Sequence, residues 1–194
     1  MANVFAIHSV GESLRTYLDN SYPTALRQAH PCAFRLLSSG ELAGHEDLDN
    51  VLSLYLFRVT INEHLRNAKR VVDPNQEETP LSVDLHYLLT VWAKSALAEH
   101  LILAWAMRQL QQHPVLDRSS LSPEAGWGAG EFIQVIPAEL SNEDIMRIWD
   151  ALDPSYRLSV SYIARVVRID TDPSLAGLPT VATRLQFTDT VEVP

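Results

Sequence analysis

The sequence has a single cysteine, Cys32, among 194 residues. One thiol excludes an internal disulfide framework and a zinc site built from thiolates. Its apolar neighbours predict an inert, buried thiol rather than a nucleophile. Long apolar runs are also missing, because the longest in the helical region, residues 101–107, is far too short for a membrane span. The N-terminus lacks a basic stretch followed by an apolar block, so we expect no secretion signal and no membrane contact.

Positive charge is scarce as well. The chain carries 15 Lys and Arg against 24 Asp and Glu, a formal net charge of −9. This field repels phosphate, so we expect no nucleic acid partner. The apolar fraction of 46% and the charged fraction of 20% are ordinary for a globular domain and argue against disorder. A chain of this length buries roughly 70% of its surface on folding, so one domain needs no metal to hold it together.

Catalytic motifs are absent. Residues 126–130, Gly-Trp-Gly-Ala-Gly, lack the features of a nucleotide-binding loop, and the chain has no Gly-x-Ser-x-Gly elbow and no His-Glu-x-x-His pair. The seven histidines are scattered, so we expect no metal and no cofactor. A general acid–base group at Asp84, His86 and Glu99 is the enzymatic alternative. The simpler interpretation places His86 and His100 as hydrogen-bonded groups at the edge of the core.

The sequence does contain clear helical and strand patterns. Apolar residues at three- and four-residue steps predict helices near the N-terminus and over 94–112 and 142–152. Alternation, or short apolar runs bounded by turn residues, predicts five strands. They cover residues 32–38, 51–63, 81–93, 132–136 and 157–169. The fold class is therefore α+β, a single domain over residues 1–170 with a mixed, largely antiparallel sheet of about five strands flanked by helices.

Three details of these patterns make sharper predictions. Residues 51–63 begin apolar on both faces, which predicts a strand covered on both sides. Apolar residues cover most of the circumference of 94–112, which predicts the central helix of the core. Ser141 opens a capping box before the last helix, and Pro137 should close the strand that precedes it.

Residues 171–194 differ from the rest of the chain. Pro173, Gly177 and Pro179 keep the first ten residues of this segment extended, and residues 181–193 then alternate almost strictly. We interpret the segment as an extended C-terminal arm that ends in an amphipathic strand. The strand could add to a sheet edge of another subunit or complete its own sheet, and the pattern leaves both open. The partner-binding residues of the arm would be its apolar face: Val181, Leu185, Phe187, Val191 and Val193.

Charge is concentrated in two places. Arg66, Lys69 and Arg70 form a basic cluster, whereas Glu46 and Asp47 belong to an acidic loop that precedes the second predicted strand. Complementary clusters predict a contact between copies of the chain, as a ring requires. A solvated surface is the alternative interpretation.

Four stretches together resemble a known family, the tail-terminator (cap) proteins of extracellular contractile injection systems, which are phage-tail-like particles. The similarity covers roughly residues 1–170 and follows the same order along the chain. The stretches are 52–67 (LSLYLFRVTINEHLRN), 81–93 (LSVDLHYLLTVWA), 98–108 (AEHLILAWAMR) and 136–152 (IPAELSNEDIMRIWDAL).

This resemblance implies a structural protein rather than an enzyme. It implies a hexameric ring that closes the inner tube and the last layer of sheath, with the chain itself, the tube and the sheath as partners. It implies no catalytic residue and no cofactor, and assembly in the bacterial cytoplasm before the particle is released. The C-terminal strand could then be presented to a sheath neighbour. A baseplate or adaptor component of the same particle, or a small-molecule enzyme around Asp84, are the alternatives.

Overall fold

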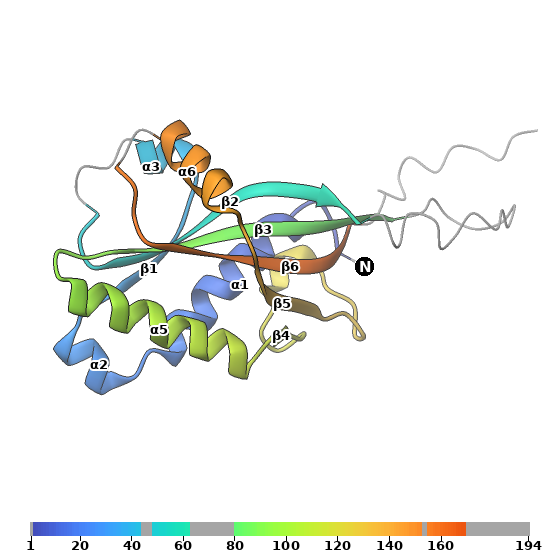
Figure 1. Cartoon of the computed structure of the whole chain (residues 1–194). Helices are drawn as coiled ribbons and strands as arrows, with labels where there is room; N and C mark the ends of the chain where they lie inside the picture. Colours follow the sequence, from blue (N-terminus) through green and yellow to red (C-terminus); the bar gives the residue numbers. More distant parts are fainter. Residues whose placement is uncertain (1, 44–47, 63–79, 153–154, 170–194) are drawn as a thin grey trace, which may run out of the picture.

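A six-stranded sheet organises the chain (Figure 1). The computed structural model describes residues 2–43, 48–62, 80–152 and 155–169. The strand order is β1-β2-β3-β6-β5-β4, with β1 parallel to β2 and all other neighbours antiparallel. The strands are β1 (Ala33–Leu37), β2 (Val51–Ile61), β3 (Leu81–Trp92), β4 (Val115–Leu116), β5 (Ile133–Ala138) and β6 (Ser159–Ile169).

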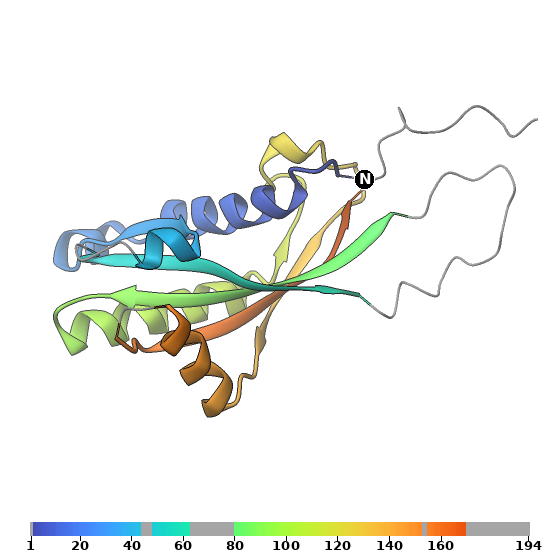
Figure 2. The same ribbon diagram turned by 90° about the horizontal axis from the view of Figure 1, so that it is seen from above.

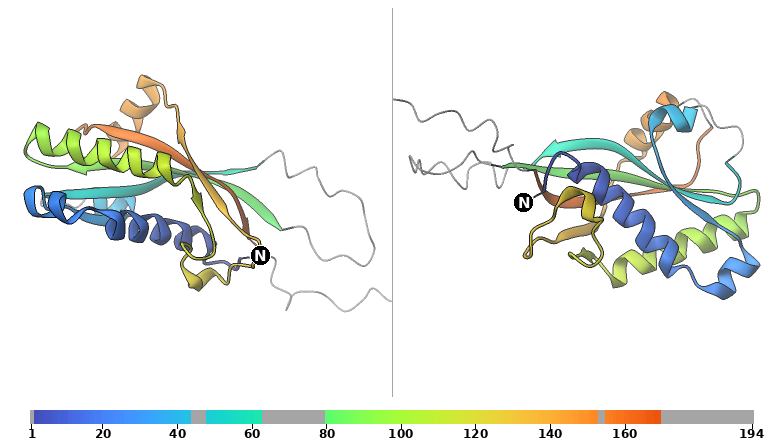
Figure 3. Two further views of the ribbon diagram at one scale, coloured as in Figure 1. Left: turned by 90° about the horizontal axis from the view of Figure 1, so that it is seen from below. Right: turned by 180° about the vertical axis from the view of Figure 1, so that it is seen from behind.

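Helices cover both faces of this sheet. The helices are α1 (Ala6–Ser21), α2 (Thr24–Ala29), α3 (Ser39–Ala43), α5 (Ala96–Gln112) and α6 (Asn142–Ala151), with a short 3-10 turn, η1 (Pro123–Ala125). The larger core lies between the sheet and the pair α1 and α5, which cover one face (Figure 3). A smaller core lies between the other face and the pair α3 and α6. The predicted α+β class, with a mixed and largely antiparallel sheet, is confirmed.

The two ends of the twisted sheet differ (Figure 2). At the end where β2 begins and β3 finishes, here called the closed end, residues 51–54 are all buried. At the opposite end, the open end, Val59 and Ile61 of β2 are 44% and 56% exposed. The prediction of a strand covered on both sides therefore holds for the first half of β2 only. Val59 and Ile61 pair with Leu85 and Val83, so they lie on the sheet face of α1 and α5, beyond the part of β2 that is buried there.

Close packing of α1 on β1 depends on Gly11. A Cβ atom at this position would stand 2.7 Å from Leu36 Cδ2, closer than side-chain carbons approach. The absence of a side chain lets the helix lie directly against the strand. Beyond α1, the sequence patterns missed α2, which has no buried residue, and the two-residue strand β4. Both are too short to show a period.

The helix α5 is not the central helix of the core, and that prediction is wrong. Its buried residues all belong to one side, which faces the sheet and α1, and include Ile102 and Trp105. Leu97 on the same helix is 66% exposed, and Met107 is 41% exposed. The exposed side mixes apolar residues with polar ones such as His100 and Arg108, so the apolar positions alone overstated how much of the circumference is buried.

Strand β5 also departs from prediction. Pro137 was expected to close the strand, but the strand continues through it to Ala138. The N–H of Val135 donates outward to Pro114 O at 2.7 Å. Because the direction alternates along a strand, Pro137 also directs its nitrogen outward, where no donor to β6 is lost. The ladder with β6 therefore runs unbroken past the proline.

The capping box before α6 is confirmed and gives a first testable prediction. Ser141 Oγ accepts the N–H of Asp144 at 3.0 Å. Replacing Ser141 with alanine should lower the free energy of unfolding by about 1 kcal/mol, because one N-terminal amide loses its partner. Urea titration measures this loss. Ser95→Ala is the matched control, since Ser95 is the N-cap of α5 without a side-chain capping bond. An equal loss in both variants would contradict the role of Ser141.

Candidate functional site

The three residues of the enzymatic alternative do not come together. Asp84 and His86 lie near the start of β3, on the sheet face that α5 does not cover. Glu99 is in the first turn of α5, which follows the other end of β3 on the opposite face. Within the described ranges, no group of three His, Cys, Asp or Glu side chains is placed to hold a metal ion. The geometry offers no acid–base site that combines these residues.

The two histidines predicted at the edge of the core, His86 and His100, differ in their surroundings. His86 is half-buried and its Nε2 lies 3.0 Å from Thr60 Oγ1. Burial, followed by the nearby Arg58 cation, holds the pKa of His86 below its ordinary value. The interpretation of His86 as a hydrogen-bonded group at the edge of the core is therefore confirmed. The same interpretation is wrong for His100, which is exposed on α5.

The buried thiol of Cys32 is confirmed and gives a second prediction. Burial raises the pKa of Cys32 to about 11. Since folding favours the neutral thiol, its contribution to stability is complete below the unfolded pKa and is lost as pH rises toward 11. Iodoacetamide at pH 8 should modify the native chain at least ~100-fold more slowly than the chain in urea, because the thiolate is the nucleophile. Mass spectrometry follows the modification, and equal rates would contradict an inert thiol.

Asp84 instead forms a hydrogen bond to an irregular part of β6 at Val166. Its Oδ1 accepts the backbone N–H of Val166 at 2.8 Å, and both carboxylate oxygens accept from Asn62 Nδ2 at 3.1 Å. Val166 has φ +64°, a left-handed conformation that is costly for a β-branched residue. The pairing of β6 with β3 shifts register at this point. The carboxylate therefore stabilises a β-bulge that the sequence patterns did not predict.

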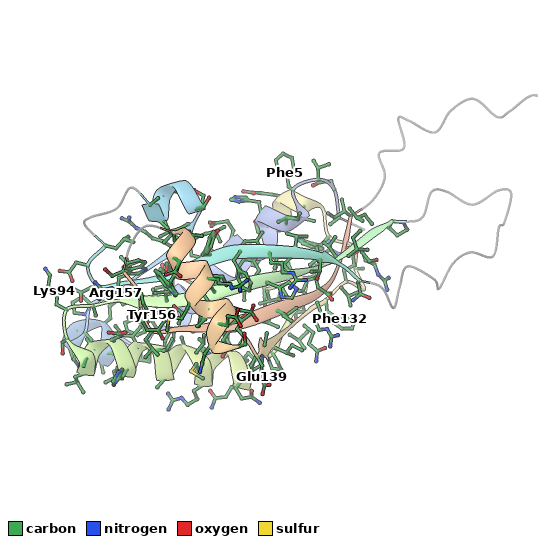
Figure 4. All side chains as sticks on the ribbon, turned by 45° about the horizontal axis from the view of Figure 1, so that its top comes forward. Phe5, Lys94, Phe132, Glu139, Tyr156 and Arg157 are labelled. Carbon is green, nitrogen blue, oxygen red and sulfur yellow. The ribbon has the colours of Figure 1, made fainter. Side chains whose placement is uncertain are left out.

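The bulge changes which side chains share a face. Residues three apart in a regular strand lie on opposite faces. The extra residue in the bulge puts Arg165 and Arg168 on the same face, because Arg165 pairs with Gln134 and Arg168 pairs with Ser82. Both arginines line a hollow of about 430 Å³. Phe132, labelled in Figure 4, also lines it and is exposed. Sequence spacing alone places these two cations apart.

The predicted interaction residues lie outside the described residues. This holds for the arm residues Val181, Leu185, Phe187, Val191 and Val193, and equally for Arg66, Lys69, Arg70, Glu46 and Asp47. The structure does fix the chain positions that flank them. Ile169, the end of β6, pairs with Leu81 at the open end of the sheet. The arm thus departs from the open end, where apolar side chains are exposed.

Comparison with known proteins identifies the family of this chain. The family described as the Pvc16 N-terminal domain matches residues 9–183. The chain belongs to this family. None of the curated proteins searched matches the sequence. The resemblance to tail terminators is supported by this match and by two solved structures that share the fold.

Those two structures are similar over nearly the whole chain. One is the sheath/tube terminator of the PVC extracellular contractile injection system in its extended state, with a TM-score of 0.56 at 16% identity, covering 95% of this chain. The other is the tube-terminating cap of the anti-feeding prophage, with a TM-score of 0.54 at 15% identity, covering 97%. The chain spans 65% and 62% of the length of those two proteins, so both are longer.

Across the part of the chain that the structure describes, no helix combines sufficient length with sufficient apolar character to cross a membrane.

Proposed function

We propose that this chain is the cap of a contractile phage-tail-like particle, where it terminates the inner tube and the last layer of sheath. The observation that carries the proposal is the family match over residues 9–183. Its fold is shared with a sheath/tube terminator and with a tube-terminating cap. The engagement of Asp84 and His86 in structural hydrogen bonds agrees with a structural rather than a catalytic role.

The cap is proposed to act as a ring of six copies. A closed ring forms when each subunit uses two different surfaces to contact its neighbours. Six chains of 21.7 kDa have a combined mass of about 130 kDa, which native mass measurement distinguishes from a monomer. The proposed partners are further copies of the chain, the tube protein and the sheath protein. Assembly in a reducing bacterial cytoplasm suits a chain with one cysteine.

The two charge clusters are proposed to meet between neighbouring copies. The acidic cluster at Glu46 and Asp47 precedes β2, and the basic cluster at Arg66, Lys69 and Arg70 follows it. The eleven residues of β2 separate the ends of the strand by about 36 Å. This separation favours a contact between copies over a contact within one copy.

Particle length tests the proposed function. Particles assembled without this chain should have tubes and sheaths of variable length, since nothing would stop their growth. Restoring the chain should restore one length, as measured by electron microscopy. Loss of the particle's opposite end, with lengths unchanged, would assign the chain to a baseplate or adaptor instead. A map of the particle end at subunit resolution then shows whether six copies form the cap.

A further inference from the structure

The second half of β2 has a free edge. Strand β1 pairs with β2 only along residues 51–55, and no described segment pairs with residues 57–61 on that side. Asn62 donates its N–H to Ser82 O on β3 at 2.9 Å. Because donors alternate in an antiparallel pair, the N–H groups of Val59 and Ile61 face away from β3. Two peptide groups are therefore available to a further strand.

The opposite edge of the sheet, formed by β4 and β5, is protected against the addition of another strand. Strand β4 covers β5 only at Ile133 and Gln134. Further along β5, Pro137 occupies the position whose N–H would face outward. A proline at such a position blocks strand addition. The free edge of β2, from Phe57 to Ile61, contains no proline.

Exposed apolar side chains lie along the free edge of β2. Val59 and Ile61 are 44% and 56% exposed and lie on the same face as the buried Val83 and Leu85, with which they pair. Phe5, just before α1, is 56% exposed and lies at the same end of the molecule (Figure 4). A strand that bonds to this edge could bury apolar side chains on one face and keep polar side chains on the other.

We propose that the free edge of β2 binds residues 181–193 from a second copy of this chain, an inference that rests on the proposed ring. The alternation of this segment fits the edge, because its apolar side chains would lie beside Val59 and Ile61. Its polar side chains, such as Gln186 and Thr188, would lie on the face of Thr60. Strand addition supplies main-chain hydrogen bonds, and the alternating side chains supply specificity.

The connectivity of the sheet favours a second copy as the donor. The arm leaves β6 at the open end, where residues 62–80 also connect β2 to β3. To reach the β2 edge of its own sheet, the arm would have to cross that connection, which folds avoid. Residues 170–180 can span about 36 Å when extended, which is enough to leave the molecule and reach a neighbour.

Cross-linking tests the donor and the acceptor together. Particles are assembled from an equal mixture of two variants, Ile61→Cys and Phe187→Cys, and treated with a short bismaleimide. A covalent dimer should form at least about tenfold more in the mixture than with either variant alone, since the buried Cys32 is unreactive. Ala138→Cys, at the edge of β5 beside Pro137, is the matched control acceptor and should give no dimer.

Two results of the cross-linking experiment would contradict the proposal. A double variant that cross-links only within one chain, while the mixture gives no dimer, would overturn the exchange between copies. Cross-links from Phe187→Cys to the sheath protein alone would overturn the acceptor. In either case, particles that still show one length would leave the proposed cap function intact, so the two failures are distinguishable.

A proline pair tests the edge itself. Val59→Pro removes an outward N–H and leaves the ladder with β3 in place, so the dimer should fall at least about tenfold while the thermal midpoint changes little. Thr60→Pro removes an N–H that faces β3 and should lower the midpoint. The arm offers an independent pair in the Phe187→Cys background, in which Leu185→Asp should abolish the dimer and Gln186→Asp should not. An unchanged dimer in both Val59→Pro and Leu185→Asp would refute the proposal.

Discussion

Replacing Trp105 with alanine should lower the free energy of unfolding by about 3–5 kcal/mol. Trp105 is only 4% exposed and forms a ring cluster with Tyr22 and Phe34. Its ring centroid lies 4.8 Å from that of Tyr22 and 5.9 Å from that of Phe34. Truncation leaves a cavity that connects α5, β1 and the end of α1, and surrounding side chains cannot fill it. Urea titration followed by circular dichroism measures the change.

Leu97→Ala is the matched control for this prediction. Leu97 is on the same helix but is 66% exposed, so its loss should change the free energy of unfolding by less than about 0.5 kcal/mol. The two variants together test whether α5 has one buried side. If both variants lowered the free energy of unfolding by several kcal/mol, α5 would be buried on both sides, as the sequence predicted.

Replacing Asp84 with alanine should cost about 2–4 kcal/mol of stability. The substitution removes the acceptor of the Val166 N–H and of Asn62 Nδ2. It also removes the group that compensates the left-handed conformation of Val166. Thermal unfolding and amide hydrogen exchange at Val166 measure the effect, and exchange there should accelerate more than in the middle of β3.

A double-mutant cycle isolates the role of the carboxylate. Val166→Gly removes the backbone strain of about 1–2 kcal/mol, so Asp84→Ala should cost less in that background, by about 1 kcal/mol. Equal costs in both backgrounds would show that Asp84 acts independently of the bulge. His86→Ala serves as a control on the same face, because His86 is bonded to Thr60 instead.

The two ends of the sheet suit different tasks. The closed end has helices on both faces and an aromatic cluster in which Trp92 lies 5.9 Å from Trp149, with the Arg157 guanidinium 5.6 Å from the Trp92 ring. The open end combines exposed Ile61 and Phe132 with the free edge of β2. A stable body with an unpartnered end is the arrangement expected of an assembly component.

Much of the secondary structure followed from local chemistry. The capping box at Ser141 is a contact between neighbouring residues, and the alternation in the first half of β3 reflects burial on one face, at Val83 and Leu85. Such features act over a few residues and can be predicted from them. The β4 strand and the α2 helix were not predicted, because elements of two and six residues are too short to show a period.

Features that depend on distant partners could not be predicted in this way. The solvent side of α5 contains apolar residues such as Leu97 and Met107 beside polar ones such as Arg108, so the apolar positions extend beyond the buried side. The hydrogen bond of Asp84 joins residues separated by 82 positions and lies at the bulge of Val166. The enzymatic alternative at Asp84, His86 and Glu99 depended on distant partners in the same way, since the sequence did not reveal which face of the sheet each residue would occupy.

By itself, the sequence determined the α+β class, the order of the longer elements and the resemblance to tail terminators, because periodicity, caps and turns are encoded locally. Only the tertiary structure decided that no described strand pairs with the second half of β2 on its outer side, that Pro137 protects the opposite edge, and that Arg165 and Arg168 share a face. These outcomes depend on strand order and register, which are set by packing between segments far apart in the chain.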